Sequence, residues 1–219
     1  MLNVWIIEIT DNLKKDEIEE LSEFVSKEKR ERIKRFHFIS DAQNTLIADI
    51  LIRSEICRLM GLDNKELVFK QNRYGKPYLD GYPDIQFNIS HTNGYVACAL
   101  DDEPVGIDIE LLKSSDLCIA ERFFCEDEKN YILNSDKNNE VFIEVWVKKE
   151  SFIKRNGQGM SMPLDSFSVL NDLPNRVVFH NVFSNHEVIC YVCTQKKDLT
   201  VNKMTISEFL SSLLKKRFF

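Results

Sequence analysis

Two carboxylates interrupt an apolar segment near the middle of this chain. Residues 105–110 read VGIDIE, and in an extended strand Asp108 and Glu110 point to one face while Ile107 and Ile109 point to the other. Two like charges on one face repel each other, and burying them unpaired costs free energy. A hard divalent cation such as Mg²⁺ prefers oxygen ligands and would relieve this repulsion. The alternative is a pair of solvated acids at a sheet edge, and this short motif alone does not decide between the two.

A third acid lies on a helix that the pattern predicts over residues 139–155. Trp146, Glu150 and Lys154 are spaced four residues apart and therefore share one face of that helix. Because Trp146 is apolar, we expect this face to pack inward and to carry Glu150 towards the interior. The alternative is a helical ion pair between Glu150 and Lys154, which would contribute little stability.

Basic and hydrogen-bonding residues gather in three segments of the first half. These are the helical run KEKRERIKR (27–35), the turn RYGKP (73–77) and the strand end FNISH (87–91). Taken singly, they have ordinary explanations as a solvated helix face, a surface turn and a hydrogen-bonded strand end. Taken together with the acids, they predict a metal flanked by basic groups, which suits a substrate that carries a pyrophosphate.

The composition narrows the class of protein. The chain has 219 residues, 43% hydrophobic and 29% charged, with a formal net charge of −6, as expected of a globular protein and unlike a general nucleic-acid binder. No segment is long enough to cross a membrane, and the first residues lack the basic region of a signal peptide. Six cysteines are scattered through apolar segments, which fits free thiols in the cytoplasm. Cys190 and Cys193 would point to opposite faces of a strand, so we expect no zinc site there.

The elements that must position these residues are short and mixed. The pattern predicts an α+β protein of two halves, residues 1–104 and 105–219. Ser26 and Asp41 are expected helix caps, Gly61 an expected helix stop, and Asn93-Gly94 an expected hairpin turn. Strands are expected at 2–9, 67–69, 85–90, 95–100, 105–110, 166–170, 177–183, 187–194 and 201–205, and helices at 13–36 (one or two), 41–60, 116–124, 126–134, 139–155 and 207–216.

Several of these segments together resemble a known family. RYGKP, FNISHTNGYVACAL, VGIDIE, RFFCEDE and WVKKESFIK match, in this order and at this spacing, the Sfp-type 4′-phosphopantetheinyl transferases. The pair of motifs G-[IV]-D-[IV]-E and W-x-x-K-E-[SA]-x-x-K makes the resemblance specific, and it extends from about residue 5 to about residue 170. It implies a pseudo-dimer of two similar α+β halves. It also implies transfer of the phosphopantetheine arm of coenzyme A, bound between the halves, to a serine of an apo acyl or peptidyl carrier protein, with release of 3′,5′-ADP.

The resemblance also implies roles for individual residues. Asp108, Glu110 and Glu150 would bind Mg²⁺, and Mn²⁺ would accept the same ligands. The remaining matches are Lys154 as the group that protonates or stabilises the leaving phosphate, Glu128 as an acid that helps deprotonate the carrier serine, Lys149 at the pyrophosphate, Lys29 and Arg32 near the 3′-phosphate, Thr45 near the adenine, and Lys76, Ser90 and His91 at the nucleotide.

Some alternatives remain open at the level of sequence. Asn44 stands where the family often has arginine, and Glu128 could equally be an exposed acid at a helix start. Phe123 and Phe124 are candidates for carrier docking, with core packing as the favoured alternative. A metal-dependent nuclease or nucleotidyl transferase would need a basic footprint, and a non-catalytic coenzyme A or carrier-binding module would not need the full set of acids. We therefore expect an enzyme, monomeric, with neither nucleic acid nor membrane as a partner.

Overall fold

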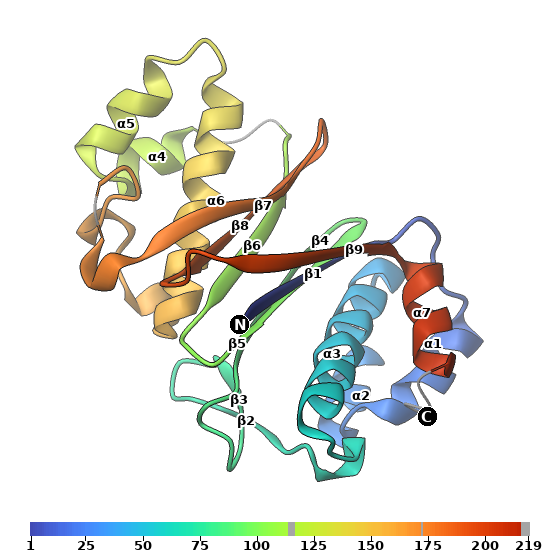
Figure 1. Cartoon of the computed structure of the whole chain (residues 1–219). Helices are drawn as coiled ribbons and strands as arrows, with labels where there is room; N and C mark the ends of the chain where they lie inside the picture. Colours follow the sequence, from blue (N-terminus) through green and yellow to red (C-terminus); the bar gives the residue numbers. More distant parts are fainter. Residues whose placement is uncertain (114–116, 172, 216–219) are drawn as a thin grey trace.

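Two β-sheets pack face to face between two groups of helices in the computed structural model, which describes residues 1–113, 117–171 and 173–215 (Figure 1). The first sheet has the strand order β4-β5-β1-β9 and the second has the order β6-β8-β7, with β2 and β3 forming a separate ribbon. The strands are β1 (Leu2–Glu8), β2 (Phe69–Gln71), β3 (Pro77–Leu79), β4 (Gln86–Thr92), β5 (Tyr95–Asp101), β6 (Gly106–Leu111), β7 (Val178–Ser184), β8 (Val188–Thr194) and β9 (Leu199–Thr205).

Helices cover the outer face of each sheet. Among the described residues, none of these helices combines the length and the apolar character that a membrane span needs. The first sheet is covered by α1 (Lys15–Leu21), α2 (Lys27–Ile33), α3 (Ile39–Met60) and α7 (Ile206–Lys215), and the second by α4 (Cys118–Phe123), α5 (Glu126–Leu133) and α6 (Asn138–Asn156) (Figure 1).

The two halves repeat one plan. In the first half, a strand (β1) leads through helices to the long α3 and then to the hairpin β4–β5, whose second strand pairs antiparallel with β1. In the second half, β6 leads through α4 and α5 to the long α6 and then to the hairpin β7–β8, whose second strand pairs antiparallel with β6. The predicted α+β pseudo-dimer is therefore confirmed, and the repeat lies in the topology although no convincing repeat is visible in the sequence.

Alternation along the strands builds three apolar layers. On β8, Cys190 faces the layer between the two sheets, whereas Cys193 faces the layer beneath α6, as the strand pattern predicted. On β6, Ile107 and Ile109 face the layer between the sheets, which leaves the opposite face to Asp108 and Glu110. The strand alternation predicted for VGIDIE is thus confirmed.

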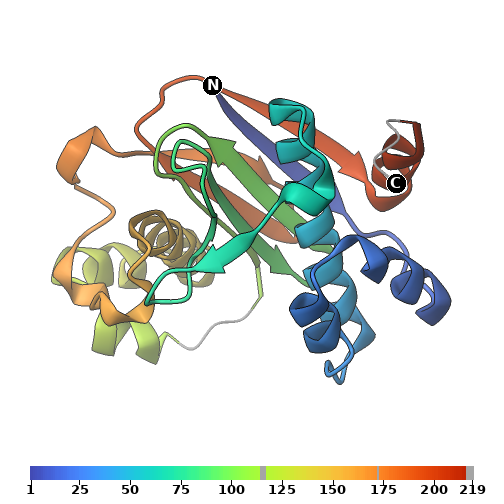
Figure 2. The ribbon, with the colours of Figure 1, turned by 90° about the horizontal axis from the view of Figure 1, so that it is seen from below.

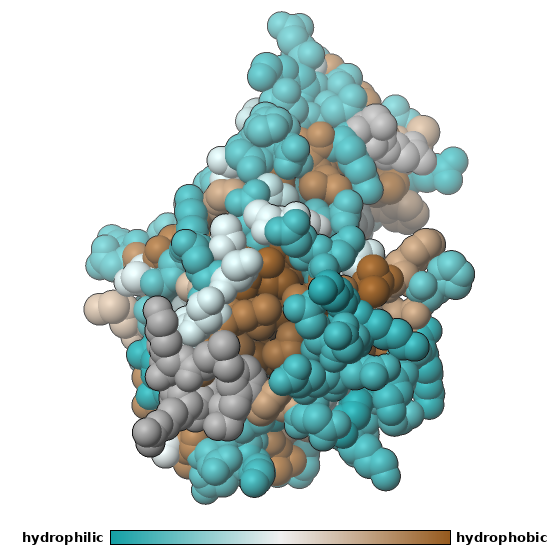
Figure 3. All heavy atoms as spheres, turned by 90° about the vertical axis from the view of Figure 1, so that its right-hand side faces the viewer, coloured by the Kyte–Doolittle hydropathy of each residue, from teal (hydrophilic) through white to brown (hydrophobic). Residues whose placement is uncertain are grey.

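The chain returns to the first sheet at its end. β9 pairs parallel with β1, and Ile206, Phe209 and Leu213 of α7 are buried in the core of the first half. This side of the molecule is mostly hydrophilic at its surface, with an apolar area near its centre (Figure 3). The division of the chain at residues 104 and 105 stays a prediction.

The predicted elements differ from the observed ones at a few places. α3 begins at Ile39 with Phe38 as its N-cap, so the prediction of Asp41 as a cap is wrong. Ser26 caps α2 and the left-handed Gly61 ends α3, as expected. No strand forms over 166–170, where the 3₁₀ turn η4 (Leu164–Ser166) is followed by the extended Phe167 and by a turn at residues 169–170. The strand β3 was not predicted. Residues 116 and 216 of two predicted helices lie outside the described residues.

Candidate active site between the two halves

The site is built where β6 passes directly against α6. A Cβ atom on Gly106 would lie 1.9 Å from the carbonyl oxygen of Ser151 and 2.5 Å from the backbone nitrogen of Arg155. Only a glycine permits this approach, which places the acidic face of β6 beside the helix that carries Glu150 and Lys154. The space that glycine leaves is therefore filled by the backbone of α6 and is not left open beside the acids.

The two halves meet where β4 of the first half lies against β6 and α6 of the second, and we call this boundary the seam. Asp108 joins these three elements there. Its Oδ1 accepts hydrogen bonds from the Ser90 hydroxyl on β4 (2.8 Å) and from Nζ of Lys154 on α6 (2.6 Å). Lys154 Nζ also donates to Ser90 Oγ at 3.0 Å. Asp108 is 3% exposed, and its second oxygen, Oδ2, is buried without a hydrogen-bond partner. A buried carboxylate oxygen with no donor is an acceptor that a cation could satisfy.

The charges of the other two predicted ligands, Glu110 and Glu150, interact with the charge of Asp108. Burial raises the pKa of Glu110, and the neighbouring Asp108 and Glu150 carboxylates raise that pKa further while Lys154 lowers it. Burial likewise raises the pKa of Glu150, with Lys154 opposing and Asp108 adding to the shift. The three acids predicted from the sequence are therefore within electrostatic reach of one another, although their oxygens do not form a set within 4.8 Å. Lys154 pairs with Asp108 across elements, in place of the helical pair with Glu150 that was the alternative.

Cations gather around His91 at the end of β4. His91 reaches solvent, but the surrounding side chains desolvate its ring, and this effect, followed by the charge of Lys154, lowers its pKa. Arg32 and Lys29 also lower that pKa, while Asp41 raises it. The cationic residues predicted on α2 and β4 thus share one electrostatic neighbourhood with Lys154.

Asp49 is a partner of this neighbourhood that sequence reasoning missed. Lys29 Nζ lies 3.0 Å from its Oδ2, and Arg53 binds its Oδ1. Asp49 is nearly buried within the apolar pattern of α3, and the only sequence signal would have been its i, i+4 spacing to Arg53. It holds Lys29 in place on the first half.

Asn88 and Asn44 are two further residues whose roles were missed. Asn88 Oδ1 accepts from the backbone N–H of Ile107 (2.8 Å), which ties β4 to β6 just beside Ser90 and Asp108. Asn44, the departure from the family pattern, donates to the carbonyl of Thr92 at 2.9 Å and is 3% exposed. Its neighbour Thr45 is also buried on α3.

Lys76 is not part of the cluster around His91. Its Nζ donates to the carbonyl oxygens of Val105 (3.2 Å) and Arg155 (3.1 Å), at the other end of the seam. Burial and the charge of Arg155 lower its pKa to about 8. Its assignment to the nucleotide stays a prediction.

Glu128 and Lys149 form an ion pair inside the second half. Lys149 Nζ lies 2.7 Å from Glu128 Oε2, and both side chains have no exposed surface. Lys149 also donates to the carbonyls of Leu164 and Phe167, while Glu128 accepts from the N–H of Val169. The structure does not bring this pair to the acids of β6, and as placed neither group reaches solvent. The geometry favours a bracing role, so their predicted roles at the serine and the pyrophosphate stay predictions.

A second group of side chains that could bind a metal lies away from the predicted ligands Asp108, Glu110 and Glu150. Among the described residues, one set of ligand atoms lies within 4.8 Å of one another, from Cys125, Asp127 and Glu128. In that set Glu128 is already neutralised by Lys149, and the Cys125 thiol donates to a backbone carbonyl. The carboxylates of the seam are spaced more widely than this set, but Asp108 retains a buried, unpartnered oxygen. The seam therefore fits a hard cation better.

Comparison with known proteins identifies the family. Residues 12–103 match the family model described as "4'-phosphopantetheinyl transferase, N-terminal", and residues 104–205 match the model of the 4'-phosphopantetheinyl transferase superfamily. The chain belongs to this superfamily. The two matched regions together cover most of the chain.

Individual relatives agree with the family models. The chain is 41% identical over 199 residues to the 4'-phosphopantetheinyl transferase Sfp of Bacillus subtilis, covering 90% of this chain and 88% of that protein. It is 31% identical to the 4'-phosphopantetheinyl transferase gsp of Aneurinibacillus migulanus, covering 100% and 98% of the two chains. A more distant relative, the L-aminoadipate-semialdehyde dehydrogenase-phosphopantetheinyl transferase of Xenopus laevis, is 33% identical over 64% of this chain and 52% of its own. Membership in the superfamily therefore extends over both halves.

Proposed function

We propose that this protein transfers the 4′-phosphopantetheine arm of coenzyme A to a serine hydroxyl of an apo acyl or peptidyl carrier protein. The serine oxygen forms a bond to the phosphorus next to the pantetheine, the bond from that phosphorus to the bridging oxygen breaks, and 3′,5′-ADP leaves with the electron pair. The observation that carries the proposal is Asp108, buried at the seam with one oxygen held by Lys154 and Ser90 and the other without a partner.

Asp108, Glu110 and Glu150 would hold Mg²⁺, or Mn²⁺ in its place. The raised pKa values of Glu110 and Glu150 and the unpartnered Asp108 oxygen are what a cluster of acids without enough positive charge shows. When bound, the metal would supply positive charge against the pyrophosphate oxygens.

The chain's own cations would orient the nucleotide. Lys29, Arg32 and His91 share one electrostatic neighbourhood and suit the 3′-phosphate, with Thr45 on the adenine side. Lys154 lies next to them, with its ammonium group already hydrogen-bonded to Ser90 and Asp108. It would donate a proton or a hydrogen bond to the leaving phosphate. Glu128 would help to deprotonate the serine directly or through water, and its burial against Lys149 favours the route through water.

The carrier protein would meet the exposed surface of the second half. Phe123 is 52% exposed at the end of α4, whereas Phe124 is buried and stacks on Phe142 and Trp146. An exposed aromatic is a suitable anchor for a protein partner, and Phe124 is a core residue. The proposal includes a cytoplasmic monomer that serves a peptide or polyketide synthase.

Coenzyme A turnover separates this enzyme from a non-catalytic binding module. We would incubate the protein with coenzyme A, Mg²⁺ and an apo carrier, and quantify 3′,5′-ADP by chromatography with and without EDTA. Release of 3′,5′-ADP that requires both Mg²⁺ and the carrier supports the transferase. Calorimetric binding of coenzyme A without any release would instead support the binding module.

A further inference from the structure

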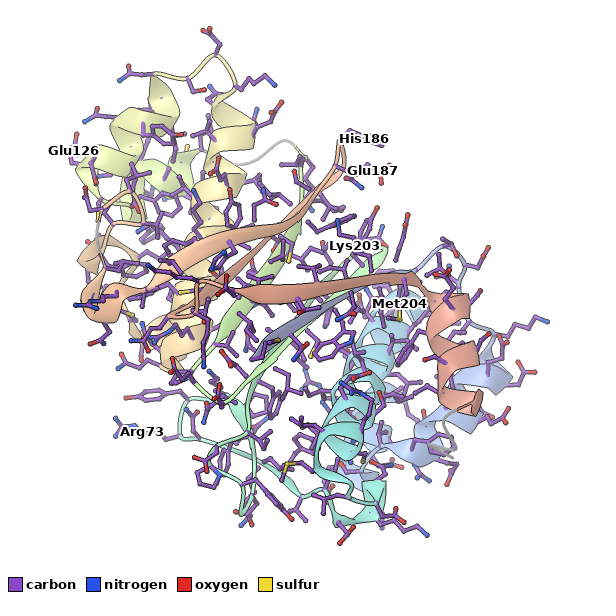
Figure 4. All side chains as sticks on the ribbon, in the orientation of Figure 1. Arg73, Glu126, His186, Glu187, Lys203 and Met204 are labelled. Carbon is purple, nitrogen blue, oxygen red and sulfur yellow. The ribbon has the colours of Figure 1, made fainter. Side chains whose placement is uncertain are left out.

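The turn between β2 and β3 reaches from the first half to the end of α6. It contains Asn72 and Lys76, and it lies beside the C-terminal end of α6 in two perpendicular views (Figures 1 and 2). Arg73, near the tip of this turn, points outward (Figure 4) and stacks on the Tyr74 ring at 4.6 Å. Asn72 and Lys76, on either side of the tip, instead contact the end of α6.

The turn is internally fixed by one side chain. Asn72 Oδ1 accepts from the backbone N–H groups of Tyr74 (2.9 Å) and Lys76 (3.0 Å). The backbone N–H of Asn72 donates to the carbonyl of Lys76 at 3.0 Å, and Gly75 takes a positive φ of 89° between them. An asparagine that closes a turn in this way sets the direction of its own amide nitrogen.

Both flanking residues donate across to α6. Asn72 Nδ2 binds the carbonyl of Gly157 at 2.8 Å, and Lys76 Nζ binds the carbonyl of Arg155 at 3.1 Å. The last carbonyls of a helix have no partner within the helix, and a cation there also interacts favourably with the helix dipole. Lys76 additionally binds Val105, just before β6. One lysine therefore joins the end of α6 to the start of the acidic strand.

The contact is tight as well as hydrogen-bonded. Gly157 has a φ of +69°, and a Cβ atom on it would lie 2.9 Å from Cδ of Lys76 and 3.3 Å from Nδ2 of Asn72. The helix therefore ends at a residue that accommodates the turn. Lys154 lies only three residues before this end.

We propose that Asn72 and Lys76 are positioning residues, which hold the end of α6 so that Lys154 and Glu150 stay aligned with Asp108 of β6. This inference rests on the proposed function and deepens it. It gives Lys76 a role different from the nucleotide contact that the family resemblance implied. The neighbouring Lys70 on β2 is exposed and pairs with Asp80, which makes it a matched control.

Steady-state kinetics of Lys76→Met and Asn72→Ala separate the two roles. A positioning role predicts that kcat falls about tenfold or more in each variant, because small displacements of reacting groups are costly, while KM for coenzyme A stays within about twofold. The preference for coenzyme A over dephospho-coenzyme A should stay unchanged. The losses of kcat from the two substitutions should be non-additive in the double variant, because both act on the same contact. The control Lys70→Met should behave as the parent protein. A rise in KM with unchanged kcat, or loss of that preference, would show that Lys76 holds the nucleotide and overturn the proposal.

Hydrogen exchange tests whether Asn72 and Lys76 hold the end of α6, without reference to activity. The amide of Gly157 donates to the carbonyl of Ile153 in the last turn of α6. Asn72→Ala is expected to speed exchange of this amide and its neighbours, while amides early in α6 keep their protection. Unchanged exchange would contradict the proposal that Asn72 holds the end of α6. A parent protein that never transfers would instead defeat the proposed function and leave the exchange result interpretable.

Discussion

Asp108 interacts with its charged neighbours at the seam in two ways, through a hydrogen bond from Lys154 and through its effect on the pKa values of Glu110 and Glu150. One oxygen is saturated by Ser90 and Lys154, and the other has no partner although the residue is nearly buried. Burial raises the pKa values of Glu110 and Glu150, and the charge of Asp108 raises them further. Without a metal, such a set of acids lowers stability, and the proposed metal site would account for it.

Replacing Asp108 with Asn should separate stability from activity. Asp108→Asn removes a charge that repels two acids but also removes the ion pair with Lys154, so these effects oppose each other and the free energy of unfolding in EDTA should change little. Transfer should fall about 10²-fold or more, because a carboxylate that would hold the metal is lost. Urea unfolding and carrier modification would be measured on one preparation, with Asp84→Asn, an exposed acid, as control. Near-normal transfer would remove the metal-site account.

At the scale of elements, the packing of β6 on α6 sets the geometry. The strand and the helix meet through Gly106, and the helix is braced on its other side by the buried Lys149–Glu128 pair. Alternation predicted which side chains of β6 face α6. Helical spacing predicted that Trp146, Glu150 and Lys154 share one face of α6, but this face is only partly buried, and the residues packed into the core, such as Val145 and Phe152, lie on other faces. Neither pattern could reveal that Lys154 pairs with Asp108, or that Asn88 binds β6, because these contacts join residues far apart in the sequence.

Gly106→Ala should displace α6. The added methyl group would overlap the backbone at Ser151 and Arg155, which neither side can relieve by rotating a side chain. We expect a loss of about 1–3 kcal/mol in the free energy of unfolding, together with a loss of transfer. Gly61→Ala, where no atom lies within 4 Å of the added carbon, tests backbone strain alone and should retain activity. Equal behaviour of the two variants would refute the close approach.

The Lys149–Glu128 pair should act on stability more than on chemistry. Lys149→Met leaves a buried carboxylate without a counter-charge and should cost about 3–5 kcal/mol, part of which the double variant with Glu128→Leu recovers. If Glu128 braces the structure, the folded double variant keeps measurable transfer. A double variant that is stable by urea unfolding yet inactive would restore Glu128 to the catalytic role predicted from the sequence.

At the scale of the molecule, two similar halves meet at a seam, and polar residues of both halves line it. The sequence predicted the fold class and most elements, because strand and helix periods are local signals. It could not predict that β9 and α7 return to the first half, nor that Lys76 lies at the opposite end of the seam from His91. Such placements depend on how the halves pack together, and no local period reports them.

Lys76 makes this junction sensitive to pH. Its pKa is about 8 in the folded protein and 10.5 as the ordinary value, so the unfolded chain binds more protons between these values. The contribution of Lys76 to the free energy of unfolding should therefore rise as pH increases through this window. Urea unfolding of the parent and of Lys76→Met at several pH values would give the difference, in which other titrations cancel. A flat difference would show that the amine is not buried as described.

Intact-mass spectrometry of apo carrier proteins is the most direct test of the central claim. The parent protein, Glu150→Gln and the matched control Glu140→Gln, an exposed acid on the same helix, would each be incubated with coenzyme A, Mg²⁺ and a panel of carriers. We predict that the parent and Glu140→Gln add the mass of one phosphopantetheine arm to at least one carrier, and that Glu150→Gln and an EDTA control do not. Equal modification by Glu150→Gln and the parent would contradict the assignment of the seam as the active site.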